Sequence, residues 1–166
     1  MEPSSSLVAH QSVQAVSSES TFEGFYAAQL KWARQLTFVL LGDSRFVDDI
    51  VHEAFIRLHR RFDQIENPRA YLRVTLVNAV RRHRRQESRR ERAHEQAAQS
   101  APDRDVTLDG LLERIDRLPY RQRAVLVLRY FEGLSEAEIA DTLGCRPGTV
   151  KSLASRALAR LREENH

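Results

Sequence analysis

The sequence predicts an all-α protein of two small helical domains joined by a flexible linker, the second domain containing a helix-turn-helix. Gly and Pro together number only eleven and aromatic residues make up 7%, a composition that favours helices over a turn-rich sheet protein. Apolar residues recur at helical spacing over residues 21–92 and again over residues 107–166. Residues 93–106 between these blocks are polar, contain Pro102 and lack an amphipathic period, so we expect them to form the linker.

Bulk composition excludes several classes of protein. The one cysteine, Cys145, cannot form an internal disulfide, and the histidines are too scattered to complete a zinc site with it, so we expect no metal and no cofactor. No run of about 18 apolar residues is present, and the N-terminus lacks both a basic start and an apolar stretch. We therefore expect a cytoplasmic protein without anchor or signal peptide. Residues 1–20 show no helical stripe, and we predict a mobile tail to which we assign no function.

The positive charge is concentrated in one stripe. Residues 81–92 contain seven arginines against two glutamates, an excess of five, whereas residues 22–80 and 108–166 each sum to only plus one. A local stripe of this kind indicates a polyanionic partner more strongly than the net charge of +3 does.

The first well-marked helix follows Gly42 and has an unusual exposed face. Its apolar residues fall at the spacing of one buried face: Val47, Ile50, Val51, Ala54, Phe55, Leu58 and Phe62. The opposite side carries Asp49, His52, Glu53, Ile56 and Arg60, which places a branched hydrophobe in a charged surface. Taken alone, this helix allows two interpretations. Single exposed hydrophobes are ordinary and Glu53 can simply pair with Arg57, or the face docks a partner helix.

The next helix begins at Asn67 and Pro68, a capping residue followed by proline at the first helical position, and runs into the arginine stripe. One side carries Leu72, Thr75, Leu76, Ala79 and Val80, and the other carries Tyr71, Val74, Asn78, Arg81 and Arg85. An aromatic ring, an amide and cations on one surface suit single-stranded nucleic acid, because rings stack on unpaired bases and arginine neutralises phosphate. A solvated helix end leading into a basic linker is the alternative.

The segment LSEAEIADTLGCRPGTVKSLASRALARLRE predicts a helix-turn-helix. Ser135 and Glu138 have the spacing of a capping box, Gly144 can end this short helix, and Pro147 can begin a second one. In such a motif the second helix lies in the DNA major groove. Its outward side carries short residues and cations that suit base edges and phosphate: Gly148, Thr149, Lys151, Ser152, Ser155 and Arg156. The alternative is an ordinary helical hairpin with a polar face.

Three segments, in the same order along the chain, resemble the sigma-70 family of RNA polymerase sigma factors. DDIVHEAFIRLHRR is similar to the polymerase-binding helix of that family, and PRAYLRVTLVNAVRRHRR to the helix that handles the minus-10 element. LPYRQRAVLVLRYFEGLSEAEIADTLGCRPGTVKSLASRALARLR resembles the domain that reads the minus-35 element. The absence of a middle domain matches the extracytoplasmic-function group.

This resemblance implies a partner for each surface. Asp48, Asp49, Glu53 and Ile56 would bind core RNA polymerase at the clamp helices of its β′ subunit, and the β subunit would be a further contact. Promoter DNA would meet two sets of residues. Tyr71, Val74, Asn78, Arg81 and Arg85 would face the opened minus-10 strand, and Thr149, Lys151, Ser152, Ser155 and Arg156 the minus-35 duplex. The resemblance also raises an anti-sigma factor as a partner, and association with the nucleoid when the protein is bound to polymerase.

Two other functions remain to be weighed. A regulator that binds an operator without polymerase would also use a helix-turn-helix, but it would not need a basic, aromatic-bearing helix suited to melted DNA. An enzyme would need catalytic residues, and the sequence offers neither a histidine near Cys145 nor a glycine-rich phosphate loop. We expect no enzymatic activity.

Overall fold

The computed structural model describes residues 21–94 and 110–163, which fold entirely into helices and short connections. The N-terminal domain consists of α2 (Phe22–Leu41), α3 (Val47–His59), a 3-10 turn (Phe62–Gln64) and α4 (Pro68–His94). The C-terminal domain consists of α5 (Gly110–Asp116), α6 (Tyr120–Leu126), a π-helical segment η2 (Val127–Phe131), α7 (Glu136–Leu143) and α8 (Pro147–Glu163). The predicted all-α fold with two small helical domains is thereby confirmed.

Local capping signals set the ends of these helices. The side-chain hydroxyl of Thr21 accepts a hydrogen bond from the Gly24 N–H at 3.2 Å. The side-chain oxygen of Asn67, Oδ1, accepts one from the Ala70 N–H at 3.0 Å. Gly42 ends α2 with φ at 75°, a left-handed conformation that favours glycine. The sequence predicted the start of α4 at Asn67 and Pro68, and the structure places it there.

The core of the N-terminal domain lies where α2, α3 and α4 meet. Leu36 and Leu40 of α2 are fully buried, as are Leu58 of α3 and Leu72 and Leu76 of α4. The face of α3 expected to be buried is buried from Val47 to Leu58. Burying each such side chain contributes about 1.5–3 kcal/mol, so this three-helix core is the main source of the domain's stability.

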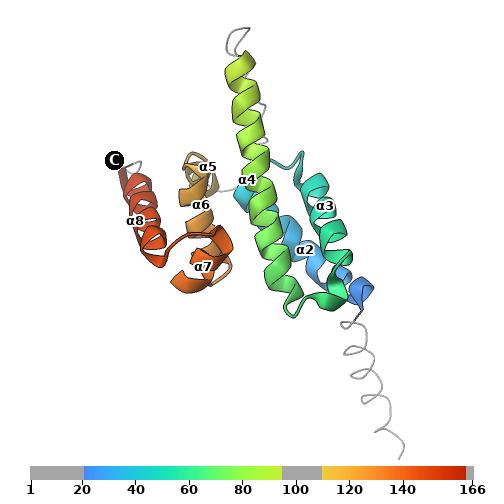
Figure 1. The fold of residues 1–166 in the computed structure, drawn as a ribbon. Helices are drawn as coiled ribbons and strands as arrows, with labels where there is room; N and C mark the ends of the chain where they lie inside the picture. Colours follow the sequence, from blue (N-terminus) through green and yellow to red (C-terminus); the bar gives the residue numbers. More distant parts are fainter. Residues whose placement is uncertain (1–20, 95–109, 164–166) are drawn as a thin grey trace, which may run out of the picture.

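The two domains pack directly against each other. Figure 1 shows α4 standing between α2 and α3 on one side and the C-terminal helices on the other. Buried residues of α6 and η2, including Val125 and Leu128, belong to the same apolar cluster as Leu40 of α2 and Val77 of α4. The sequence did not indicate how the domains are oriented, and the structure adds a shared core that crosses the domain boundary.

One helix end differs from the prediction, and several predicted segments lie outside the described residues. The helix α4 continues to His94, two residues beyond the expected end of the first helical block at Arg92, and so includes the first two residues of the predicted linker, Ala93 and His94. The predicted tail at residues 1–20 and residues 95–109, with most of the predicted linker, lie outside the described residues. Among the helices of residues 21–94 and 110–163, none is long and apolar enough to cross a membrane.

Candidate partner and nucleic-acid interfaces

The outward face of α3 is exposed as its helical rotation predicts. Asp49, His52 and Glu53 point to solvent, and Ile56 is 41% exposed. A branched hydrophobe this exposed in the middle of a charged helix face is only partly covered by the protein's own side chains. The face therefore has the composition of a small interface, with an apolar centre and a charged rim.

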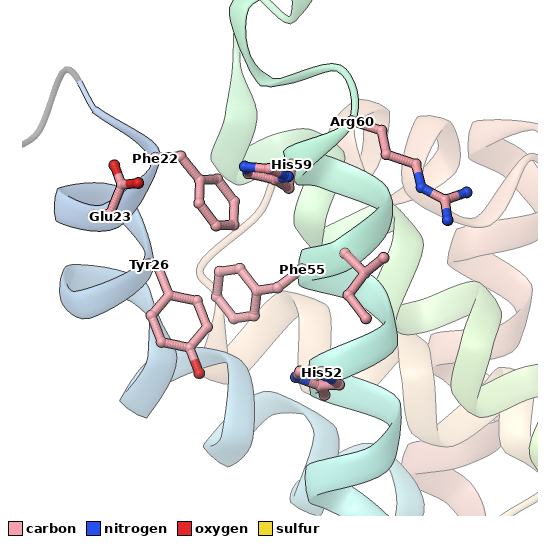
Figure 2. A pocket seen from close by; sticks show the side chains of 8 residues that line it. Phe22, Glu23, Tyr26, His52, Phe55, His59 and Arg60 are labelled. Carbon is pink, nitrogen blue, oxygen red and sulfur yellow. The ribbon is translucent and has the colours of Figure 1, made fainter.

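An aromatic groove adjoins Ile56 and extends this face toward α2. It has a volume of about 480 Å³ and lies between the first turns of α2 and the exposed side of α3. Figure 2 shows the rings of Phe22 and Tyr26 from α2 facing those of Phe55 and His59 from α3. Phe22 meets His59 edge-on with centroids 4.5 Å apart, and Tyr26 meets Phe55 at 4.7 Å. These edge-to-face contacts fix the groove's walls, so it can receive an apolar side chain without rearranging.

Two of the three acidic residues of α3, Asp48 and Glu53, form ion pairs with basic neighbours. Asp48 forms an exposed ion pair with Arg34 of α2, with 2.8 Å between nitrogen and oxygen. Glu53 pairs with Arg57 one turn along α3. Exposed pairs of this kind contribute only about 0–1 kcal/mol to stability, so both carboxylates could exchange these partners for those of another protein at little cost.

A second cleft, of about 320 Å³, lies between α3 and α4 and brings together most of the residues predicted to face single-stranded DNA. Tyr71, Val74, Asn78 and Arg81 line it, and Arg85 lies exposed farther along the same helix. The cleft also contains residues that the prediction did not include: Arg57, Thr75 and Arg82. It therefore combines an aromatic ring, an amide and three guanidinium groups around a recess.

Two α4 residues differ from the sequence-based description of its faces. Thr75 was expected on the buried side with Leu72 and Leu76, but it lines the cleft, and its hydroxyl donates to the Tyr71 carbonyl at 2.8 Å. Arg81 lies at the border between the cleft and the C-terminal domain, close to Tyr120 of α6. Burial raises the pKa of Tyr120, and the positive charge of Arg81 acts against that rise.

The helix-turn-helix has the predicted local structure. The Ser135 side chain accepts from the Glu138 N–H, and the Glu138 carboxylate accepts from the Ser135 N–H at 2.8 Å, so the capping box is complete. That backbone hydrogen bond, with a second from the Ser135 hydroxyl, holds the pKa of Glu138 below its usual range. Gly144 ends α7 with φ at 62°, and Pro147 begins α8.

The outward face of α8 presents its predicted residues to solvent. Lys151, Ser152, Ser155 and Arg156 are exposed, and Thr149 is half-buried at the start of the helix. Within the sequence this face has no acidic residue before Glu163, but folding brings Glu136 of α7 to 3.6 Å from the Lys151 ammonium. Lys151 is thus oriented by a neighbouring carboxylate, a contact that periodicity along α8 could not show.

Among the described residues, no group of three or more His, Cys, Asp or Glu side chains is placed to hold a metal ion. The features that the structure does present are surfaces: the α3 face with its groove, the α4 cleft and the α8 face.

Comparison with known proteins assigns the chain to a family. A family model described as "Sigma-70 region 2" matches residues 25–90, and one described as "Sigma-70, region 4" matches residues 108–161. The chain is 35% identical to the "RNA polymerase sigma-E factor" of Streptomyces coelicolor over 144 residues, which cover 82% of this chain and 79% of that protein. The chain belongs to the sigma-70 family. The resemblance stated from the three sequence segments is confirmed, including its extracytoplasmic-function group.

Further relatives agree with this assignment. The chain is 34% identical to the "Probable ECF RNA polymerase sigma factor SigI" of Mycobacterium tuberculosis over 77% of its own length and 50% of that protein. Two solved structures share the fold. The sigma factor RpoE of Bartonella quintana, in complex with the anti-sigma factor NepR, matches with a TM-score of 0.70 at 24% identity, covering 86% of this chain and 94% of that one. CnrH, in complex with the cytosolic domain of CnrY, matches with a TM-score of 0.61 at 23% identity, covering 91% and 94%.

Sequence reasoning missed residues that reach a surface from another helix. Phe22 and Tyr26 line the groove beside Ile56, and their spacing of four residues, which puts both on one helix face, was the available signal. Arg57 was interpreted only as a partner of Glu53, although it also borders the α4 cleft. Its position depends on how α3 packs against α4, which no local pattern specifies.

Proposed function

We propose that this protein is a sigma factor that binds core RNA polymerase, directs it to specific promoters and promotes strand opening during transcription initiation. The observation that carries the proposal is the combination of three different surfaces on one chain of the sigma-70 family: an apolar docking face, a recessed basic cleft and an exposed recognition helix. No single one of them would distinguish a sigma factor from another regulator.

Core polymerase would bind α3 at the β′ clamp helices. Ile56 and the adjoining groove would receive apolar side chains of the partner helix, while Asp48, Asp49 and Glu53 would meet its basic residues. The support for this role is the exposure of Ile56 next to a preformed aromatic recess, an arrangement typical of the centre of an interface. Additional contact with the β subunit belongs to the same proposal.

The opened minus-10 strand would bind along α4. Tyr71 offers a ring for stacking on an unpaired base, Asn78 offers an amide for a base edge, and Arg81 and Arg85 offer charges for phosphates. The supporting feature is the recess itself, because an unpaired base can enter a cleft of this size, whereas a base held in a duplex cannot leave its stack without a cost of a few kcal/mol.

The minus-35 duplex would bind α8 in its major groove. Lys151 and Arg156 would contact phosphates or guanine, and Thr149, Ser152 and Ser155 are short enough to let the helix approach the bases closely. The first helix of the motif, α7, would then cross the DNA backbone.

The domain division follows from these roles. Residues 21–92 would form the polymerase-binding and minus-10 domain, residues 93–106 the linker, and residues 107–166 the minus-35 domain. The protein would act in the cytoplasm, on the nucleoid when bound to polymerase, without enzymatic activity of its own. An anti-sigma factor is a further partner to test for.

The alternative is a helix-turn-helix regulator that binds an operator without polymerase. The family assignment and the α4 cleft both favour the sigma factor. A mobility-shift experiment separates the two, with the protein and core polymerase tested on promoter DNA alone and together. A sigma factor should bind weakly alone and tightly with polymerase, whereas tight, sequence-specific binding by the protein alone would favour the operator-binding regulator.

The polymerase-binding face can be tested separately with Ile56→Lys. Because Ile56 is already 41% exposed, the substitution opens no cavity and circular dichroism should be unchanged, while co-purification with core polymerase should fall by about tenfold or more. Leu111→Lys, the same chemical change at a leucine of α5 that is 54% exposed, is the matched control and should co-purify normally. Equal co-purification of both variants with core polymerase would show that Ile56 does not lie in the interface.

A further inference from the structure

A carboxylate of α7 lies between two cations on the exposed side of the helix-turn-helix. Glu136, the first residue of α7, has one oxygen 3.3 Å from the Arg129 guanidinium of η2 and the other 3.6 Å from the Lys151 ammonium of α8. The contact with Arg129 is also a hydrogen bond, which the Nη2 group donates to Oε1 of the carboxylate. Three consecutive elements of the domain therefore meet at one side chain.

The position of this carboxylate is fixed by the structure around it. Glu136 follows Ser135 directly, and the capping box of Ser135 and Glu138 sets where α7 begins. The Glu136 side chain is 30% exposed, whereas that of Lys151 is 69% exposed and ends in an ammonium on a flexible four-carbon stem. The glutamate is therefore the fixed member of the pair, and the lysine is the member that it positions.

Arg156, the other cation of α8 predicted to face duplex DNA, lacks such a partner. Its side chain is exposed, and within residues 21–94 and 110–163 it forms no ion pair or hydrogen bond. A cation in this state beside a duplex is attracted to the phosphates, which carry the negative charge of DNA but no sequence information. The two cations of α8 therefore have different electrostatic surroundings before any DNA is bound.

The carboxylate changes what Lys151 can bind. An ammonium only donates hydrogen bonds, and the O6 and N7 atoms of guanine are acceptors that suit it in the major groove. Pairing with Glu136 compensates part of the lysine's charge, and the carboxylate itself repels phosphate. When DNA displaces water from the pair, the attraction between its two charges becomes stronger because the local dielectric constant falls. The pair therefore favours a base edge over the backbone.

We propose that Glu136 is a positioning residue for base recognition: anchored by Arg129, it keeps Lys151 on a guanine of the duplex and away from the phosphates. The identity of that duplex as a minus-35 element rests on the proposed function. The positioning role does not, because any helix-turn-helix presents its second helix to the major groove. The consequence is a division within α8, in which Lys151 reads sequence and Arg156 binds the backbone.

Four substitutions in the full-length chain test this role. Glu136→Gln keeps the size of the side chain and removes its charge, and Lys151→Gln identifies the base pair that the lysine contacts. Arg129→Gln removes the cation that holds the carboxylate from the side of η2. The matched control is Glu163→Gln, which removes the same charge from an exposed residue of α8 about 18 Å along the helix axis from Lys151. Far-UV circular dichroism should be the same for all four variants and wild type.

The measurement is selection of bound duplexes from a library of random sequence, with core polymerase present and absent, followed by sequencing. Wild type should prefer guanine at one position where Lys151→Gln shows no preference. At that position alone, Glu136→Gln should lower the preference by about fivefold and Arg129→Gln by about twofold, while Glu163→Gln behaves like wild type. Combining Glu136→Gln with Lys151→Gln should give the result of Lys151→Gln, because the glutamate acts through the lysine.

The affinity for duplexes of unrelated sequence provides a second readout. Glu136→Gln should bind them about threefold more tightly than wild type, and its salt slope should steepen by about one, because the released Lys151 becomes a phosphate contact. The slope of Glu163→Gln should equal that of wild type. A merely structural role of Glu136 would instead weaken binding to every duplex.

The outcomes separate this inference from the proposed function. An unchanged guanine preference in folded Glu136→Gln overturns the positioning role, as does a loss spread over several positions, and Arg129→Gln decides alone if Glu136→Gln loses helix. Failure of wild type to enrich any sequence, with or without polymerase, also overturns it, because no base contact is then present. Enrichment that polymerase does not strengthen would reject the sigma-factor function, while a loss confined to the Lys151 position would still support the positioning role.

Discussion

The two helices proposed to contact DNA, α4 and α8, divide their surfaces differently. The helix α8 has two sides: Val150, Ala154 and Ala157 are buried within its own domain, and the opposite residues face solvent. The helix α4 has three sides. Leu72 and Leu76 pack within the N-terminal domain, Arg73 and Val77 face the C-terminal domain, and Asn78 lines the cleft.

A helix that packs against two domains keeps less surface for a ligand than a helix that packs within one domain. On α8 one side is buried and the other is exposed, whereas on α4 two of the three sides pack against the rest of the chain and one lines the cleft. A change on the buried side of α4 should therefore affect both domains. A change on the exposed side of either helix should affect one interaction with DNA.

The largest expected effect tests whether α4 couples the two domains. Leu76→Ala removes a fully buried side chain and should cost about 2–5 kcal/mol of unfolding free energy. Because α4 contacts both domains, urea unfolding followed by Trp32 fluorescence and by helical circular dichroism should shift together in one transition. Leu111→Ala, at an exposed leucine of α5, should change stability by less than about 0.5 kcal/mol. Two separate transitions in the wild type would show that the domains are not coupled.

A smaller effect should separate the roles of the two helices in DNA binding. With core polymerase, Arg156→Ala should weaken initial promoter capture by about 1–3 kcal/mol, and Asn78→Ala should instead impair formation of the open complex. A promoter with a pre-melted minus-10 bubble should rescue Asn78→Ala but not Arg156→Ala, because it removes only the cost of unpairing. Permanganate footprinting and filter binding measure the two steps. Equal defects of both variants on both templates would mean that α4 and α8 do not act at separate steps of promoter capture and strand opening.

Arg82 and Arg85 of α4 can be tested through the salt dependence of DNA binding. Replacing both with glutamine should lower affinity for many sequences alike and reduce the salt slope of binding by about two, as expected for two phosphate contacts. Arg84 does not belong in this set, because it donates to the Leu41 carbonyl and lies 3.7 Å from Asp116. Arg84→Gln should leave the salt slope unchanged, and a fall in the slope would place it on the DNA.

The smallest effect concerns the capping box that orients α7 before α8. Ser135→Ala should cost about 1 kcal/mol in urea unfolding. Since the folded pKa of Glu138 lies below its unfolded value, its contribution is full above the ordinary value of 4.5 and is lost as the pH falls through the folded pKa. The stability gap between wild type and Ser135→Ala should therefore narrow in acid. Ser88→Ala, at an exposed serine of α4, is the control. A gap independent of pH would exclude the hydrogen bond from the Ser135 hydroxyl to the Glu138 carboxylate, because the backbone N–H of residue 135 is present in both proteins.

The same contrast between α4 and α8 explains which features of the structure could be predicted from the sequence. The faces of α8, the capping box and the exposure of Ile56 were predicted correctly, because each depends on spacing within one helix. The groove, the recess beside Asn78 and the pair of Lys151 with Glu136 depend on contacts between helices, which spacing does not specify. Thr75 shows the limit on α4: two sides can be assigned from periodicity, but a third side cannot.

The central claim is most directly tested by transcription from fragmented genomic DNA with purified core RNA polymerase, with and without this protein, followed by sequencing of the transcript starts. The account predicts that the protein creates a set of new start sites that share sequence elements near minus 35 and minus 10, and that these starts disappear with Ile56→Lys. Start sites identical with and without the protein would contradict it.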